Sequence, residues 1–147
     1  YVLVEQLIAH DQIDLAYDLL TSVKKGSFGY LKKRGETTIW EYLDTKWCSH
    51  AHPMFGGVSE FLLKTFLGLP DGEYDKTVVL QPKFPHKLRR AKGSALYDGK
   101  IVEVEWRRIK NTIRYKVFVT EGLNVSVVYG NDITQLQTGE NEICVEL

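Results

Sequence analysis

The pattern of hydrophobic and polar positions divides the chain into a first part with helical spacing and a second part with strand-like alternation. In residues 1–69 apolar side chains recur every three or four positions, as they do along one face of an α-helix. In residues 77–147 apolar and polar residues tend to alternate one by one, as on a half-buried strand. We therefore expect helices first and a sheet domain second, with a boundary near residues 70–76.

The first part begins with a pair of short helices. Leu3, Leu7 and Ile8 follow helical spacing, and this first helix is expected to end at His10-Asp11. Asp11 is expected to cap the second helix. The second helix is expected to bury one stripe of side chains, which contains Ile13, Ala16, Tyr17 and Leu20. Because almost nothing separates the two helices, they are expected to form an antiparallel helical hairpin.

Two further segments complete the first part. Residues 24–30 read Lys-Lys-Gly-Ser-Phe-Gly-Tyr, and their glycines and aromatic rings suit a bent loop. A third helix is predicted from about Gly57 to Leu67, and Gly68 and Pro70 are expected to end it. Its expected buried residues are Val58, Phe61, Leu62, Thr65 and Phe66.

The second part predicts several short strands joined by tight turns. The expected strands cover residues 77–80, 91–97, 100–109, 112–120, 125–129 and 142–147. Asp98-Gly99 is the dipeptide that a two-residue type I′ turn prefers, because both of its central residues need a positive φ. Trp106 lies in an alternating strand pattern, which favours the core over an exposed carbohydrate-binding platform that it would share with Tyr97, Tyr115 and Tyr129. This spacing predicts an antiparallel β-sandwich.

Charge and composition narrow the class of partner. The chain has 19 basic and 19 acidic residues, a formal net charge of zero, so neither a nucleic acid nor an acidic membrane surface is expected as a partner. No run of about twenty apolar residues predicts a membrane span. Cys48 and Cys144 lie far apart and outside any C-x-x-C pattern, so reduced thiols are expected. The chain begins at Tyr1 inside a helical pattern, which we interpret as a sign that it is part of something longer.

The stretch Thr37–Tyr42 places the carboxylate of Glu41 directly beside the indole of Trp40. A carboxylate next to a large apolar ring is poorly hydrated, which suits a general base, and an indole offers a flat face to a sugar ring. The pair alone fits a core tryptophan beside a solvated charge even better. Both interpretations therefore stay open at the level of these two residues.

Residues 48–57 read C-S-H-A-H-P-M-F-G-G and contain a His-x-His pair, His50 and His52. No third ligand stands at the spacing of a known zinc site, so neither a metal nor another cofactor is expected. Histidines in a loop before a helix are suited to hydrogen bonds with hydroxyls or a carboxylate. The alternative is that one of them caps the helix expected to begin near Gly57.

Four motifs together carry a family resemblance. They are D-L-A-Y-D-L-L, then G-x-x-x-L-x-x-R-G-E-T-T-I-W-E, then S-H-A-H-P-M-F-G-G-V-S-E-F, and finally L-Q-P-K-F through A-K-G-S-A-L-Y-D-G-K-I-V-E-V-E-W. Over residues 1–108 the chain resembles glycoside hydrolase family 78, the inverting α-L-rhamnosidases. The resemblance implies that residues 1–72 are the closing, C-terminal portion of an (α/α)6 catalytic barrel of helical hairpins. It implies that residues 73–147 form the antiparallel β-sandwich that follows the barrel.

The resemblance also implies roles for individual residues. Glu41 corresponds to the general base, Trp40 to a wall of the rhamnose pocket, and His52 to a histidine that contacts the sugar or the base. Ala51 stands where the family usually has an asparagine, which makes His50 a candidate substitute for that polar contact. The implied substrate is a rhamnose-containing glycoside or polysaccharide, and no metal or cofactor is implied.

The family's general acid lies well upstream of the part that this chain resembles. The resemblance therefore implies an active full-length enzyme and an inactive fragment. The expected partner of the fragment is the remainder of its own barrel, and a homodimer through exposed helix faces is the alternative.

Two other interpretations of function stay open. The first is a non-catalytic carbohydrate-binding or interaction module, in which the sandwich binds the ligand and the helices are a scaffold. The second is a helical-barrel glycosidase for another sugar, such as a glucosidase or a trehalase-like enzyme. The tryptophan, glutamate and histidines define a pyranose site but not the hydroxyl pattern of its sugar.

Overall fold

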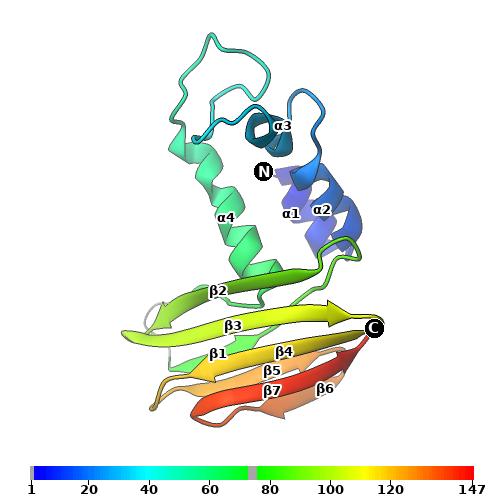
Figure 1. The fold of residues 1–147 in the computed structure, drawn as a ribbon. Helices are drawn as coiled ribbons and strands as arrows, with labels where there is room; N and C mark the ends of the chain where they lie inside the picture. Colours follow the sequence, from blue (N-terminus) through cyan, green and yellow to red (C-terminus); the bar gives the residue numbers. More distant parts are fainter. Residues whose placement is uncertain (1, 73–75) are drawn as a thin grey trace. The chain divides into compact units, whose positions relative to one another are not determined.

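The computed structural model describes residues 2–72 and 76–147 and divides the chain into two compact units (Figure 1). The helical unit covers Tyr1–Phe61, and the sheet unit covers Leu62–Leu147. Short helices followed by β-sheets confirm the predicted fold class, helical-hairpin elements followed by a β-sandwich. In the described residues no helix is long and apolar enough to span a membrane.

The helical unit begins with the predicted hairpin. Helices α1 (Val2–Ala9) and α2 (Ile13–Thr21) pack side by side (Figure 1). The predicted cap is wrong, because Gln12 occupies the N-cap position of α2 and no side chain caps this helix. Asp11 instead lies in the turn with a φ of 59°, a left-handed conformation that aspartate tolerates better than most residues. Asp11 therefore helps to reverse the chain direction between the two helices.

The segment predicted as a bent loop contains the start of a third helix, α3 (Phe28–Lys33). Ser27 is its N-cap, and its hydroxyl accepts a hydrogen bond from the Tyr30 amide at 3.3 Å. Gly29 lies inside α3. Only glycine fits there, because a Cβ would come within 2.5 Å of the backbone oxygen of Thr21. The glycine that suggested a loop in the sequence therefore marks a close approach of α2 and α3.

The predicted helix near residues 57–67 is present but irregular and begins earlier than expected. A 3-10 turn, η1 (Pro53–Gly57), leads into α4 (Val58–Phe61), and a π turn, η2 (Leu62–Phe66), follows. Leu62 was predicted to be buried but is 45% exposed, because the π turn shifts the phase of the side chains. The two compact units divide between Phe61 and Leu62, and the predicted limit of the catalytic barrel at residue 72 stays a prediction.

The sheet unit contains two sheets that enclose one core. The strands are β1 (Thr77–Leu80), β2 (Arg90–Tyr97), β3 (Lys100–Ile109), β4 (Thr112–Val119), β5 (Asn124–Tyr129), β6 (Asp132–Gln135) and β7 (Gly139–Glu146). One sheet is antiparallel with the order β2-β3-β4-β7, and the other has the order β1-β5-β6 (Figure 1). The sequence did not show that β1 pairs with β5 in parallel, and it missed β6, whose four residues are all exposed.

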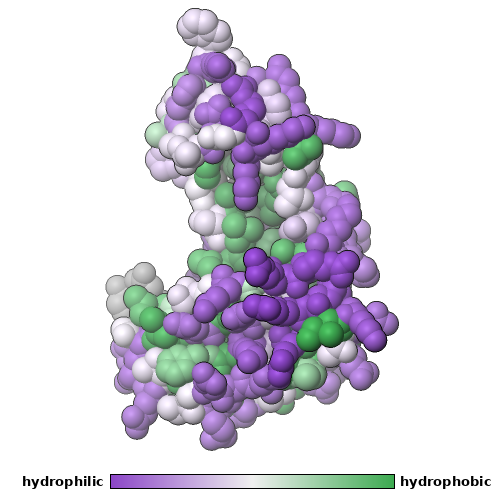
Figure 2. Space-filling model, viewed as in Figure 1, coloured by the Kyte–Doolittle hydropathy of each residue, from purple (hydrophilic) through white to green (hydrophobic). Residues whose placement is uncertain are grey.

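The alternation of β3 and β4 builds the core of this unit. Trp106 and Tyr115 are fully buried, and the predicted placement of Trp106 in the core is confirmed. Asp98 and Gly99 have φ values of 50° and 72°, as the predicted β2–β3 turn requires. On the visible face of the sheet unit, hydrophilic side chains cover most of the surface between small hydrophobic areas (Figure 2).

Three buried aromatic residues, Tyr97, Trp106 and Tyr115, form what we call the aromatic clamp. Their donors reach carbonyls of the segment that follows the π turn: Trp106 Nε1 to Phe66 O (2.7 Å), Tyr115 OH to Leu67 O (2.5 Å) and Tyr97 OH to Pro70 O (2.8 Å). A buried carbonyl costs free energy unless it accepts a hydrogen bond, so these three bonds stabilise the chain where it leaves the π turn. The clamp thereby holds residues 66–70 against the sheet.

Candidate functional site

The candidate site lies in the irregular segment between α3 and η1, and we call residues 39–52 the site loop. Two backbone hydrogen bonds close it: the Glu41 amide donates to Ser49 O at 2.9 Å, and the His52 amide donates to Ile39 O at 2.8 Å. The backbones of residues 39–41 and 49–52 therefore run against each other. All four residues predicted for the site, Trp40, Glu41, His50 and His52, lie in this loop.

Trp40 and His50 form a ring stack at the centre of the site loop. Their ring centroids lie 4.0 Å apart, and the ring planes differ by only 5°. The indole is 2% exposed, whereas His50 is exposed to solvent. His50 Nε2 lies 3.0 Å from Lys46 O and must donate this hydrogen bond, because a carbonyl oxygen only accepts. The buried Trp40 ring therefore supports the imidazole of His50, whose orientation is fixed by this hydrogen bond.

Glu41 is half-buried and held by the opposite side of the loop. Its Oε2 accepts a hydrogen bond from the Ser49 amide at 3.3 Å, in addition to the backbone bond between the same two residues. Within the described part of the chain, no hydrogen bond to Oε1 accompanies this one. One carboxylate oxygen is thus oriented by the backbone, and the other keeps its capacity to accept a proton or a hydrogen bond.

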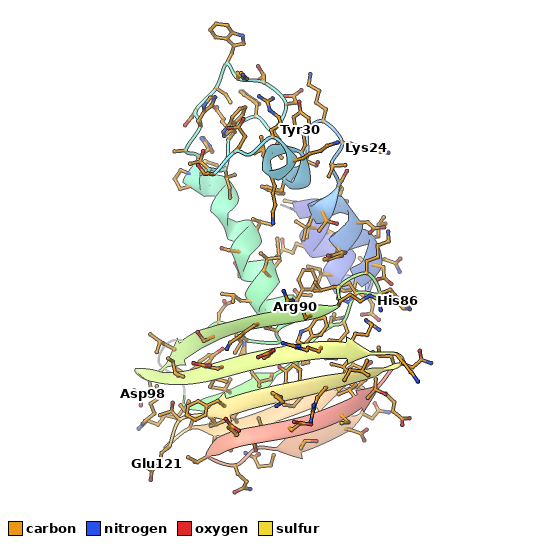
Figure 3. The ribbon with its side chains drawn as sticks, in the orientation of Figure 1. Lys24, Tyr30, His86, Arg90, Asp98 and Glu121 are labelled. Atoms are coloured by element: carbon orange, nitrogen blue, oxygen red, sulfur yellow. The ribbon has the colours of Figure 1, made fainter. Side chains whose placement is uncertain are left out.

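Arg34 is a neighbour of the site that sequence reasoning missed. It follows α3, and its guanidinium carbon lies 5.3 Å from the Trp40 ring centroid and 5.5 Å from that of Tyr30. Arg34 Nη1 donates to the Tyr30 hydroxyl at 3.4 Å, and Nη2 pairs with Glu36 Oε1 at 3.5 Å. Figure 3 labels Tyr30, which extends from α3. The only sequence signal was the position of Arg34 at the start of the R-G-E-T-T-I-W-E motif.

The titratable side chains of the site loop do not form a cluster. In the described residues, no group of three or more His, Cys, Asp and Glu side chains is placed to hold a metal ion. Cys48 and Cys144 are both free thiols, and Cys48 Sγ lies 3.3 Å from Thr45 O.

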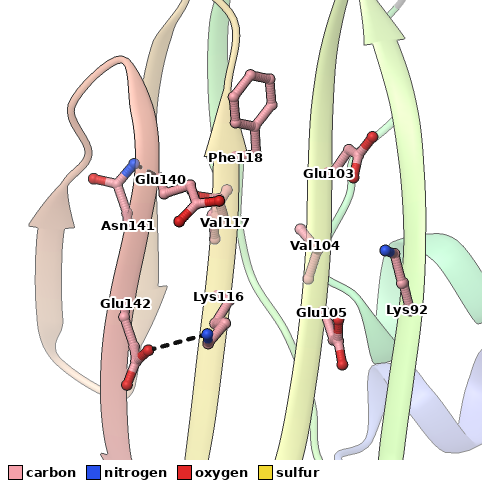
Figure 4. A pocket seen from close by; sticks show the side chains of 10 residues that line it. All are labelled: Lys92, Glu103, Val104, Glu105, Lys116, Val117, Phe118, Glu140, Asn141 and Glu142. Carbon is pink, nitrogen blue, oxygen red and sulfur yellow. Dashed lines mark hydrogen bonds and ion pairs between the residues drawn. The ribbon is translucent and has the colours of Figure 1, made fainter.

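A second candidate is a hollow of about 400 Å³ on the solvent face of the four-stranded sheet (Figure 4). Its side chains include Lys92, Glu103, Lys116, Phe118, Glu140 and Glu142. Phe118 is 43% exposed and stands in register between Glu103 and Glu140 on the neighbouring strands. The buried rings of the aromatic clamp contribute no exposed platform to this face.

Residues 1–66 match a family model described as the bacterial α-L-rhamnosidase 6 hairpin glycosidase domain. Over these residues the chain is similar to that family. The matched region contains Arg34 and the complete site loop. Comparison with curated proteins gives no match.

Solved α-L-rhamnosidase structures share the fold of the fragment. The structure from Dictyoglumus thermophilum is 21% identical with a TM-score of 0.79 and covers 96% of this chain and 20% of its own. The Streptomyces avermitilis structure, a complex with L-rhamnose, is 20% identical with a TM-score of 0.82 and covers 95% of this chain and 17% of its own. The Aspergillus terreus structure is 19% identical with a TM-score of 0.86, and the match covers 96% of this chain and 18% of the Aspergillus chain. The chain thus spans about a fifth of the length of the proteins whose fold it shares.

Proposed function

We propose that the chain is part of an inverting α-L-rhamnosidase and that Glu41 is the general base of its catalytic site. The observation that carries the proposal is the family match over residues 1–66, which contains a loop with an oriented glutamate, two histidines and a buried indole. The substrate class that follows is a glycoside or polysaccharide with a terminal α-L-rhamnose.

In the proposed reaction Glu41 removes a proton from a water molecule, which attacks the anomeric carbon from the face opposite the leaving group. A carboxylic acid protonates the departing oxygen, and the two carboxyl groups of an inverting enzyme lie about 6.5–9.5 Å apart. The Ser49 amide orients Glu41 Oε2 and leaves Oε1 for the water. His50 and His52 bind sugar hydroxyls, and Trp40 forms the wall of the pocket from behind the His50 ring.

The fragment alone is proposed to have negligible activity, because the general acid belongs to the remainder of the barrel. Two nearby carboxylates are already paired, Glu36 with Arg34 at 3.5 Å and Asp44 with Lys25 at 3.9 Å. The test offers p-nitrophenyl α-L-rhamnoside to the 147-residue chain and to the full-length protein. Turnover by the short chain at a rate near that of the full-length protein would refute this part of the proposal.

The role of Glu41 is tested by Glu41→Gln in the full-length protein. We expect kcat to fall by roughly 10²- to 10⁴-fold, the usual contribution of general base catalysis, while the affinity for L-rhamnose changes little. Asp44→Asn is the matched control, because it neutralises an exposed carboxylate of the same loop. A Glu41→Gln enzyme that keeps its kcat within a few-fold of the wild type would reject the proposed base.

A second proposal is a carbohydrate-binding function of the sheet unit, favoured by the exposed Phe118 between two carboxylates. An aromatic face beside hydrogen-bond acceptors suits a sugar ring. Phe118→Ala would then abolish sugar binding by the protein, and Glu41→Gln would have no effect on any measured property. The opposite pattern favours the hydrolase.

A barrel glycosidase for another sugar is distinguished by a panel of nitrophenyl glycosides. The proposed rhamnosidase hydrolyses the α-L-rhamnoside with the highest kcat/KM. A preference for an α-glucoside would assign the same acid–base site to a different sugar.

Exposed apolar side chains on the hairpin support the proposed partners of the helical unit. Val2, Leu3 and Leu15 are 67%, 60% and 55% exposed. In the full-length protein we propose that other hairpins of the barrel cover such residues, with residues 1–72 as the barrel portion and residues 73–147 as the sandwich. In the isolated chain the same faces would pair two copies. Light scattering of both forms tests this, and a monomeric isolated chain would contradict the pairing.

A further inference from the structure

We infer that Arg34 is a positioning residue of the site: its guanidinium fixes Trp40 and, through Trp40, the imidazole of His50. The inference rests on the proposed function of the site loop and adds a residue that does not belong to the loop. Because Arg34 acts through His50, it affects the affinity for the sugar rather than the rate of the chemical step.

The side chain of Arg34 reaches from the end of α3 to the buried ring of Trp40. Its side chain is only 26% exposed, and its guanidinium contacts the rings of Trp40 and Tyr30 at 5.3 and 5.5 Å. A guanidinium within about 6 Å of a ring centroid is attracted by the π-electrons, and it is planar, so it also packs against a ring as an ammonium cannot. The Tyr30 hydroxyl and Glu36 hold the same group from its edge.

The effect of Arg34 passes to His50 because Trp40 and His50 are stacked at 4.0 Å with nearly parallel planes. A shift of the indole removes the surface on which the imidazole lies. In the described part of the chain, the other contact that orients the His50 ring is its hydrogen bond to Lys46 O, at 3.0 Å. One hydrogen bond fixes a direction but leaves the ring free to rotate about it.

Glu41 is held independently of this stack. Among the described residues, Glu41 is held by the backbone bond to Ser49 O and by the bond from the Ser49 amide to Oε2, and neither involves Arg34 or a ring. Loss of the guanidinium should therefore disturb the sugar-binding imidazole and leave the proposed base in place.

The role of Arg34 as the C-cap of α3 does not account for these contacts. The cap is made by its backbone amide, which donates to carbonyls of Tyr30 and Leu31. A substitution of the side chain leaves this amide intact, so the helix end and the positioning role can be separated.

The kinetic experiment compares Arg34→Met, Arg34→Lys and Lys33→Met in the full-length protein on p-nitrophenyl α-L-rhamnoside. Lys33 is the matched control, an exposed cation of the same helix turn. For Arg34→Met we expect KM to rise roughly 3- to 30-fold, the range of a cation–π contact, with kcat nearly unchanged. Arg34→Lys restores the charge but not the planar contact and should recover only part of the affinity. Lys33→Met should match the wild type.

A double-mutant cycle tests whether Arg34 acts through His50. If it does, Arg34→Met adds little to the KM of His50→Ala, because the group that it positions is already gone. Independent, additive increases in KM would overturn the inference, and so would a loss of kcat at unchanged KM in Arg34→Met.

A readout without turnover separates this inference from the proposed function. In protein labelled with 5-fluorotryptophan, the Trp40 signal is assigned by its loss in Trp40→Phe, and the Trp106 signal reports an intact fold. We expect Arg34→Met and His50→Ala to shift the Trp40 signal and Lys33→Met to leave it in place. An unshifted Trp40 signal in Arg34→Met rejects the positioning role whatever Glu41→Gln shows. A shifted signal with a fully active Glu41→Gln rejects the proposed function alone.

Discussion

Trp40 and Trp106 are both buried, yet different kinds of contact hold them. Trp106 projects from the alternating strand β3 and donates its ring N–H to Phe66 O at 2.7 Å. Trp40 lies in an irregular loop and is held by a stacked His50 and a guanidinium from the end of α3. The first environment follows from regular backbone geometry and serves stability. The second depends on side chains of an irregular loop and of a helix end, and it supports the groups proposed for chemistry.

Of the changes that test this comparison, removal of the Trp106 ring should have the largest effect on stability. For Trp106→Ala we expect the free energy of unfolding of the sheet unit to fall by about 3–5 kcal/mol, because a large buried ring leaves a cavity. Trp106→Phe keeps most of the volume but removes the hydrogen bond to Phe66 O, which costs about 0.5–1.5 kcal/mol. Hydrogen exchange of the β3 and β4 amides in urea measures both. Equal losses in the two variants would show that packing contributes little.

Trp40→Phe should show that the stability of the site loop is local. A smaller ring weakens the stack with His50, and aromatic pairs contribute about 0.5–1.5 kcal/mol beyond their burial. We expect the Glu41 and His52 amides, which close the loop, to exchange roughly tenfold faster, with the β3 amides unchanged. Faster exchange in both units would contradict a local role for Trp40.

Tyr97→Phe tests the contribution of the aromatic clamp to the stability of the sheet unit at alkaline pH. Burial, and after it the charge of Asp71, raises the pKa of Tyr97 to about 12. An unfolded tyrosine ionises near pH 10, so this contribution to stability is complete below about pH 10 and is lost as the pH rises through about 12. Tyr97→Phe should cost about 0.5–1.5 kcal/mol at neutral pH through the lost bond to Pro70 O and should reduce the alkaline decline.

Urea midpoints between pH 8 and 12 measure the effect of Tyr97→Phe. A residual decline is expected from Tyr115, because burial and the neighbouring Tyr97 also raise its pKa. An alkaline slope identical in the variant and the wild type would exclude Tyr97 as a source of the decline.

The smallest effect is expected at the exposed pair of Arg114 and Glu142. The hydrogen bond from Arg114 lowers the pKa of Glu142. Its contribution is therefore present above the unfolded pKa of about 4.3 and is lost as the pH falls through the lower folded value. Glu142→Gln should flatten the acid limb of thermal stability slightly at low salt, and 1 M salt should erase the difference. A difference that persists in high salt would indicate more than a charge pair.

The sequence predicted the sheet unit better than the helical unit for a physical reason. Alternation places Trp106 in the core, and Asp98-Gly99 fits the turn because both residues adopt a positive φ. Gly29 instead misled the prediction, because a glycine that permits a close approach of two helices looks the same in sequence as a loop glycine. The parallel pairing of β1 with β5 joins residues that are distant in the chain, and local patterns do not contain that information.

The candidate site could be located from the sequence but not assembled. The W-E and His-x-His motifs identified four residues of one loop, whose roles stay predictions. The stack of Trp40 on His50 and the approach of Arg34 depend on how the loop closes and on the end of α3. No periodic pattern encodes such contacts, because the loop has no regular structure.

The central claim, that Glu41 activates a water molecule, is tested most directly by azide rescue of Glu41→Gln in the full-length protein. Azide is a nucleophile that needs no proton removed, so it can replace the water that a missing base no longer activates. We predict that azide raises the rate of Glu41→Gln on p-nitrophenyl α-L-rhamnoside, leaves the wild type unaffected and yields the β-L-rhamnosyl azide, the inverted product. A Glu41→Gln enzyme with wild-type turnover and no response to azide would contradict the account.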